Sequence, residues 1–163
     1  MRMPSPTAAF LLGHPAHFIA LGFGAGLSRV APGTVGTLVA LPLGWVLDAY
    51  ASPLGWLAAI VAVTAIGTWA ARRTAHDLGV ADHGSIVIDE IAAFLPVLFF
   101  AGADVLRQSI AFVLFRIFDI LKPPPIRQVD AAMKGAVGVM ADDFLAAGYT
   151  LLVLAILQRL AGV

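Results

Sequence analysis

The sequence predicts an all-α, multi-helical integral membrane protein whose polar site faces the cytoplasm. Hydrophobic residues make up 60% of the 163 residues and charged residues only 12%, against roughly 45–50% and about 25% in a soluble domain. Apolar residues also form five long stretches, and eight of the ten acidic and seven of the ten basic residues fall within residues 28–37, 71–90 and 116–143. We call these three regions the polar segments. The length fits a single domain, residues 1–163.

Five apolar stretches are expected to be the main helices, and they comprise residues 36–50, 53–70, 91–103, 109–121 and 144–160. A spanning helix needs about 17–25 residues, so several of these stretches are short for a full crossing. A soluble protein with helices that are apolar on all sides is the alternative. Turn-forming residues at 51–53 and 101–104 predict short hairpins on one side of the bundle.

The charge distribution predicts the orientation in the membrane. If all five stretches cross, the polar segments share one side, which then carries eight of the ten basic residues and leaves Arg107 and Arg159 opposite. Basic residues are enriched in cytoplasmic loops, so this side is predicted to be cytoplasmic.

The remaining segments are expected to lie at the membrane surface. Residues 10–26 are apolar but contain His14 and Pro15, which predicts an interfacial helix followed by a loop. Three consecutive prolines at 123–125 must end the fourth helix. Residues 126–133 then predict a short amphipathic helix at the interface.

Composition excludes several functions. The net charge is zero and the pI is near 6.9, so there is no basic field to hold a nucleic-acid backbone. The chain has no cysteine, which excludes thiolate metal sites and cysteine nucleophiles.

The first polar segment contains Gly33 and Thr34 at the start of an apolar helix. Backbone N–H groups at a helix start form a favourable anion site, and glycine permits close approach of a phosphate. Ordinary capping by Thr34 explains the same residues equally well.

Two adjacent acidic pairs, Asp89-Glu90 and Asp142-Asp143, each precede an apolar stretch. Carboxylates at a membrane boundary are costly unless they are paired or bound to a cation. Mg²⁺ needs only one or two carboxylates together with substrate phosphate and water, so the two pairs could share a metal. Stabilisation of helix N-termini is the alternative for Asp89 and Glu90.

Arg116, Asp119 and Lys122 follow one another at intervals of three on the fourth apolar stretch. This spacing places them on roughly one helix face. Arg116 and Lys122, with Lys134 nearby, are candidates for neutralising phosphate oxygens. A salt-bridge ladder at the membrane edge is the alternative.

Four strings in this order resemble the phosphatidylglycerophosphatase A family: APGTVG at 31–36, IVIDE at 86–90, FRIFDILKP at 115–123 and GVMADD at 138–143. The resemblance extends from about residue 24 to residue 149. It implies a Mg²⁺-dependent multi-pass enzyme of the bacterial inner membrane that hydrolyses phosphatidylglycerophosphate to phosphatidylglycerol and inorganic phosphate. The partners are then this lipid and the bilayer, and homo-oligomer formation stays open.

The resemblance also implies roles for individual residues. The metal ligands would be Asp89, Glu90, Asp142 and Asp143, and the catalytic residues Arg116, Asp119 and Asp142. Gly33, Thr34, Lys122 and Lys134 would contact the substrate phosphate.

The residue pattern narrows the chemistry. Without a cysteine or a known phosphatase nucleophile motif, carboxylates with a metal remain, and these would orient a water for in-line attack. An aspartyl-phosphate at Asp119 or Asp142 is left open. A transporter or channel is less favoured, since its charges would lie near mid-span, and the spaced acidic signature of CDP-alcohol phosphotransferases is absent.

Overall fold

The structure is a computed structural model that describes residues 6–81, 83–133 and 135–161. The described residues form helices without strands, which confirms the predicted all-α class. In chain order the elements are α1 (Ala8–Gly13), α2 (Pro15–Ala20), the 3₁₀ helix η1 (Gly22–Leu27), α3 (Pro32–Tyr50), α4 (Pro53–Leu78), α5 (Ile88–Ala101), α6 (Val105–Leu121), α7 (Ile126–Ala132) and α8 (Ala136–Ala161).

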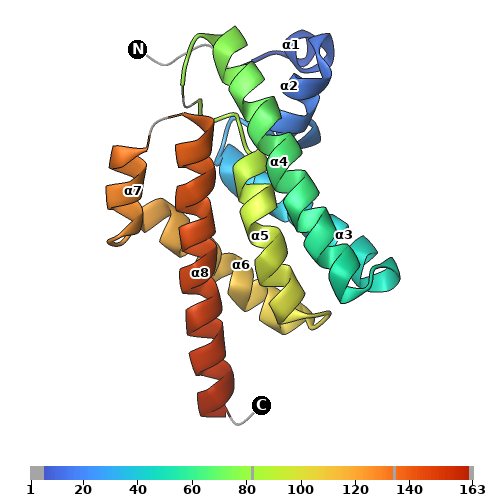
Figure 1. Ribbon diagram of the computed structural model, residues 1–163, viewed down its shortest axis with the longest axis vertical. Helices are drawn as coiled ribbons and strands as arrows, with labels where there is room; N and C mark the ends of the chain where they lie inside the picture. Colours follow the sequence, from blue (N-terminus) through green and yellow to red (C-terminus); the bar gives the residue numbers. More distant parts are fainter. Residues whose placement is uncertain (1–5, 82, 134, 162–163) are drawn as a thin grey trace.

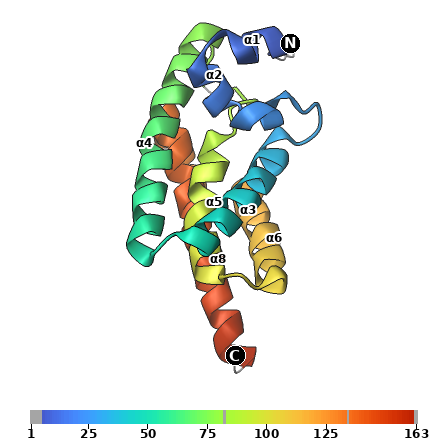
Figure 2. The same cartoon turned by 90° about the vertical axis from the view of Figure 1, so that its right-hand side faces the viewer.

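Helix α5 is the centre of the bundle. It packs against α3, α4, α6 and α8 (Figures 1 and 2), and almost every side chain along it is buried, including Ile91, Phe94, Leu95 and Leu98. A helix that is apolar on all sides needs such surroundings.

The bundle has two chemically different ends. The N-terminal helices, the α4–α5 connection and the start of α8 lie together at one end, which we call the polar end (Figure 1). The short α3–α4 and α5–α6 connections lie towards the opposite end, which we call the hairpin end. This arrangement agrees with the expected grouping of the polar segments.

The hairpin connections are closed by helix caps. The Ser52 hydroxyl accepts a hydrogen bond from Gly55 N (3.2 Å), and Pro53 occupies the first turn of α4. The Asp104 carboxylate accepts a hydrogen bond from Arg107 N (2.8 Å) at the start of α6. These side chains satisfy N–H groups that have no partner inside the helix.

The N-terminal segment differs from the expected single interfacial helix and loop. Two short helices, α1 and α2, meet at His14, whose Nδ1 accepts a hydrogen bond from Ala16 N (3.0 Å). Pro15 then starts α2, which packs against α4. Proline is favoured at the first position of a helix and disfavoured further inside, so His14-Pro15 divides the segment.

The perimeter of the bundle is apolar. Helices α4 and α8 are long and apolar enough to cross a membrane, judged by length and composition. Large apolar side chains such as Leu57, Val61, Trp69 and Leu152 are about half exposed or more. These features are consistent with a membrane protein, since water-exposed apolar patches of this kind are unusual on soluble proteins.

Candidate active site

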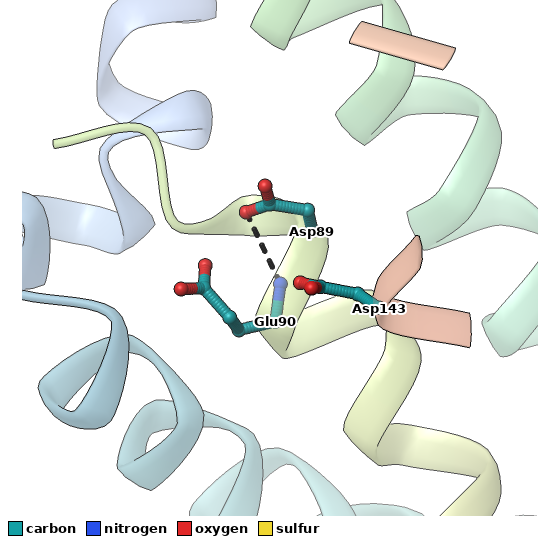
Figure 3. A group of neighbouring side chains, drawn as sticks. All are labelled: Asp89, Glu90 and Asp143. Carbon is teal, nitrogen blue, oxygen red and sulfur yellow. Dashed lines mark hydrogen bonds between the residues drawn. The ribbon is translucent and has the colours of Figure 1, made fainter. Parts of the chain in front are cut away.

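Three acidic side chains meet at the polar end, inside the bundle. Asp89 and Glu90 lie in the first turn of α5, and Asp143 reaches them from α8 (Figure 3). One carboxylate oxygen of each lies within 4.8 Å of the others. Asp89 and Asp143 are only 4% and 3% exposed. We call these three residues the carboxylate group.

The carboxylate group is poor in hydrogen-bond donors. Glu90 Oε2 and Asp143 Oδ2 are buried and have no partner among the described residues, although Asp89 Oδ1 accepts a hydrogen bond from Glu90 N (3.1 Å). Burial away from water and the short separation of the three carboxylates both disfavour their charged forms unless a cation is bound. Unpartnered buried oxygens from three carboxylates fit a hard divalent cation.

Arg116 of α6 lies beside the carboxylate group. Its Nη1 is 2.7 Å from Asp119 Oδ2 and 3.6 Å from Glu90 Oε1, and it donates a hydrogen bond to Thr37 Oγ1 (3.3 Å). The Arg116 Nε atom is buried and without a partner in the described part of the chain. The guanidinium therefore keeps a donor free.

Gly33 allows α3 to approach the site closely. A Cβ at this position would overlap Glu90 Oε1 and lie 3.1 Å from Arg116 Nη2. The start of α3 has no side-chain cap, and Thr34 lies in its first turn rather than at the cap, which is Ala31. No side chain therefore caps the first N–H groups of α3, which leaves them available to an anion.

Lys122 forms a second charged group with Asp142 and Asp130. It ends α6 in a left-handed conformation (φ 44°), forms a short ion pair with Asp142 and lies 3.2 Å from Asp130 Oδ1. Burial alone would lower the pKa of Lys122, but its bonds to Asp142 and Asp130 outweigh burial and raise that pKa above its ordinary value. Asp142 Oδ1 is buried without a described partner.

The structure thus divides the predicted site residues. Asp89, Glu90 and Asp143 come together, whereas Asp142 turns to Lys122. Arg116 and Asp119 pair with each other, and Lys122 leaves their helix face at the end of α6. The predicted phosphate contact Lys134 lies outside the described residues.

Sequence reasoning did not single out Thr37 for the site. Thr37 is fully buried, and its hydroxyl donates to Gly33 O (2.9 Å) while it accepts from Arg116. The available signal was its position four residues after Gly33, which places both on one helix face.

A cluster around Asp77 was also missed. Asp77 Oδ2 lies 3.0 Å from His17 Nε2 and 2.8 Å from Arg73 Nε, and Asp77 Oδ1 lies 3.0 Å from His76 Nδ1. His17 Nδ1 is 2.9 Å from Phe10 O, and its ring stacks on the Phe10 ring. We call Asp77, His17, Arg73 and His76 the brace cluster because it links α2 to α4.

The braced N-terminal segment supports the chain that leads into the carboxylate group. Val87 N donates to Ala20 O (2.9 Å) one residue before α5 begins. Gly26 packs so closely that an added Cβ would overlap the carbonyl of Ser85. The entry into α5 is therefore fixed from the N-terminal side.

Comparisons with known proteins identify the family of the chain. A family model described as Phosphatidylglycerophosphatase A matches residues 18–158. The chain is 39% identical over 136 residues to phosphatidylglycerophosphatase A of Escherichia coli K12, covering 83% of this chain and 78% of the relative. It is 40% identical over 156 residues to the Haemophilus influenzae protein of the same name, covering 94% and 95%.

A third relative, from Bacteroides thetaiotaomicron, is provisionally named a phosphatidylinositol-3-phosphatase and is 38% identical over 152 residues, covering 88% of this chain and 94% of the relative. No solved structure matches the chain. The family model covers most of the sequence, and relatives near 40% identity are matched over most of their length. The chain therefore belongs to the phosphatidylglycerophosphatase A family.

Proposed function

We propose that this protein is a Mg²⁺-dependent lipid phosphatase that hydrolyses phosphatidylglycerophosphate to phosphatidylglycerol and inorganic phosphate. The observation that carries the proposal is the donor-poor carboxylate group beside Arg116, with Lys122 on the same side of the bundle. Family membership supports the substrate, since two relatives are named for this activity.

Asp89, Glu90 and Asp143 are the residues that would hold Mg²⁺. When bound, the ion would neutralise charge on the phosphoryl oxygens and lower the pKa of a coordinated water. Asp142, which was also expected to be a ligand, is engaged by Lys122, so we assign it a different role.

The substrate phosphate would be held by three kinds of donor. Arg116 offers its unpartnered Nε, and the uncapped first turn of α3 offers the N–H groups of Gly33 and Thr34. Lys122 has three ammonium hydrogens, of which Asp142 and Asp130 engage two. These donors compensate charge as the phosphoryl group is transferred.

We assign Asp142 Oδ1 as the atom that accepts the proton of the attacking water. It is buried and unpartnered in the described structure, while Oδ2 is held by Lys122. A carboxylate fixed by one oxygen can accept a proton at the other.

A covalent phosphate on Asp119 or Asp142 is the alternative. Acid-quenched turnover of ³²P-labelled substrate separates the two routes, because only the covalent route leaves label on the protein.

The proposal is tested by phosphate release from phosphatidylglycerophosphate by the detergent-purified protein. Release should require Mg²⁺, stop with excess EDTA and return when Mg²⁺ is restored. Phosphatidate and phosphatidylinositol 3-phosphate serve as competing substrates. No release by folded, Mg²⁺-supplied protein would overturn the proposed reaction, and preferred release from either competitor would overturn the substrate.

We also propose a multi-pass topology in the inner membrane with the polar end in the cytoplasm. The cysteine-free chain allows single reporters at exposed positions, Ala81→Cys at the polar end and Tyr50→Cys at the hairpin end. A membrane-impermeant maleimide applied to intact spheroplasts should label Tyr50→Cys only. Labelling of Ala81→Cys alone would reverse the orientation.

A further inference from the structure

An apolar groove runs between α3 and α6, beginning below the candidate active site. It has a volume of about 220 Å³. Its walls are Leu38, Leu41 and Trp45 from α3 and Val105, Gln108, Ser109, Phe112 and Val113 from α6. In Figure 2, α3 begins beside α6 and then crosses in front of α5.

Two polar bridges bracket this groove. At the polar end Arg116 donates to Thr37 (3.3 Å), and at the hairpin end Trp45 Nε1 donates to Gln108 Oε1 (2.9 Å). The bridges are eight residues apart on both helices, which corresponds to about 12 Å along the axis. Between the bridges the wall residues are apolar except for Ser109. The first bridge contains Arg116 and therefore links this end of the groove to the candidate active site.

The middle of the groove is built from side chains one helical turn below the site. Leu41 follows Thr37 by four residues, and Phe112 precedes Arg116 by four, so each lies on the same helix face as its partner. Phe112 in turn packs against the buried Phe94 of α5, with ring centroids 6.1 Å apart.

The polar atoms in the groove wall are already satisfied. Gln108 is 3% exposed, accepts from Trp45 and donates to Gly102 O (2.7 Å). The Ser109 hydroxyl donates to Val105 O (2.7 Å). The wall therefore offers an occupant apolar surface and no free hydrogen-bonding group, which suits a hydrocarbon chain.

We propose that this groove holds one acyl chain of the lipid substrate, with the Thr37–Arg116 bridge at the boundary between the chain and the phosphorylated headgroup. This inference rests on the proposed lipid phosphatase function. Because hydrocarbon surrounds the protein in either case, the groove gains little from hydrophobic burial. Its role is to orient the lipid so that its phosphate reaches Arg116 and the carboxylate group.

Other grooves of similar volume do not connect to the site. One of about 250 Å³ is lined by the last turns of α5, from Pro96 to Phe100, and by the start of α4. Two more, of about 280 and 250 Å³, are lined by the far half of α8 and by Arg107. All three lie towards the hairpin end, whereas the α3–α6 groove starts one residue after Thr37.

The groove is tested by blocking it with Val113→Trp. Val113 is 54% exposed at the groove wall. The matched control is Val61→Trp on α4, at a residue that is 60% exposed and lines none of the grooves described above. Each variant is assayed with diacyl phosphatidylglycerophosphate and with its deacylated, water-soluble counterpart, which carries the same two phosphates.

Val113→Trp should lower kcat/KM for the diacyl substrate about tenfold more than for the deacylated one, because a displaced chain misplaces the phosphate. Val61→Trp should affect the two substrates equally. If Val113→Trp lowers kcat/KM equally for the two substrates while the wild type is active, the acyl-chain role of the groove is overturned but the proposed function is not. A wild type that cleaves neither substrate overturns the proposed function as well.

A second measurement does not depend on the fold of a variant. A phosphatidylglycerophosphate analogue with a diazirine in one acyl chain is photolysed on the wild-type protein, and the modified peptides are identified. Modification should concentrate in residues 38–45 and 105–113. Modification confined to α4 and α8 would overturn the assignment.

Discussion

The polar end contains two acidic centres that differ in their supply of donors. In the brace cluster, Asp77 is met by His17, Arg73 and His76 at 2.8–3.0 Å. In the carboxylate group, Glu90 Oε2 and Asp143 Oδ2 have no partner in the described structure, and Arg116 approaches Glu90 only at 3.6 Å.

This difference separates a structural carboxylate from a functional one. A carboxylate surrounded by donors holds two helices together and has little capacity left for a ligand. Buried carboxylates without donors raise the energy of the folded protein until a cation joins them. Replacement of a residue in the carboxylate group should therefore abolish activity without loss of stability, and replacement in the brace cluster should do the reverse.

The largest effect is expected for Asp89→Asn. Loss of an outer-shell partner alone costs metal sites about 10–100-fold, so loss of a ligand should lower kcat/KM by more than about a hundredfold. The apparent melting temperature of the metal-free variant should not fall, because one of three buried charges is removed. Phosphate release and thermal melting check both parts, with Asp48→Asn at an exposed position as the control. Activity within tenfold of wild type would refute the role of Asp89.

Gly33→Ala should have the next largest effect. The new methyl group overlaps Glu90 Oε1, so the carboxylate must shift and activity should fall about tenfold. Gly148→Ala on α8 is the matched control, since a Cβ there meets nothing within 4 Å. If both variants keep full activity, the close approach of α3 is not needed for catalysis.

Asp77→Asn should reverse the pattern seen with Asp89→Asn. The amide lacks the charge that pairs with Arg73 and His17, so the apparent melting temperature should drop. Activity per folded molecule should fall less than in Gly33→Ala, because Asp77 does not touch the site. Melting curves and activities normalised to folded protein make the comparison. Unchanged melting with lost activity would instead place Asp77 in the functional machinery.

The smallest effect on the melting temperature is expected from replacing His17 or His76, which both contact the Asp77 carboxylate. The His17 side chain is 8% exposed and that of His76 is 85% exposed. His17→Gln loses the stacking on Phe10 (centroids 4.0 Å apart) and should lower the melting temperature slightly, whereas His76→Gln should leave it unchanged, since exposed ion pairs contribute little. Equal shifts in melting temperature would show that burial does not separate them.

The helices could be predicted largely from the apolar pattern. The apolar stretch at 53–70 begins where α4 begins, at Pro53, because Ser52 and Pro53 are strong helix-start residues. The apolar stretch predicts that the last helix begins at residue 144, but α8 begins eight residues earlier, at Ala136. The apolar pattern predicts that Asp142 and Asp143 precede the helix, but both lie inside α8, where the ion pair with Lys122 accommodates Asp142.

The residue types of the site could be predicted from the sequence. How these residues divide between the carboxylate group and the group around Lys122 could not. Consecutive residues on a helix point about 100° apart, so adjacency of Asp142 and Asp143 could not reveal that they face different partners. Thr37 and the brace cluster depend on contacts between distant parts of the chain. His17 and Asp77 are sixty positions apart, and local spacing carries no information about such a pair.

In the proposed membrane topology, the enclosure of α5 bears on how the enzyme would tolerate bilayers of different thickness. At 14 residues, about 21 Å, α5 is much shorter than a bilayer core, but its neighbours surround it, so lipid would not set its position. The depth of Asp89 and Glu90 is therefore fixed by protein packing. In the proposed topology the helices that carry the site, α3, α5, α6 and α8, would keep their positions relative to one another. A thinner or thicker bilayer would then be matched by tilt of the bundle as a whole, and the distance between the carboxylates and their phosphate-binding partners would stay constant.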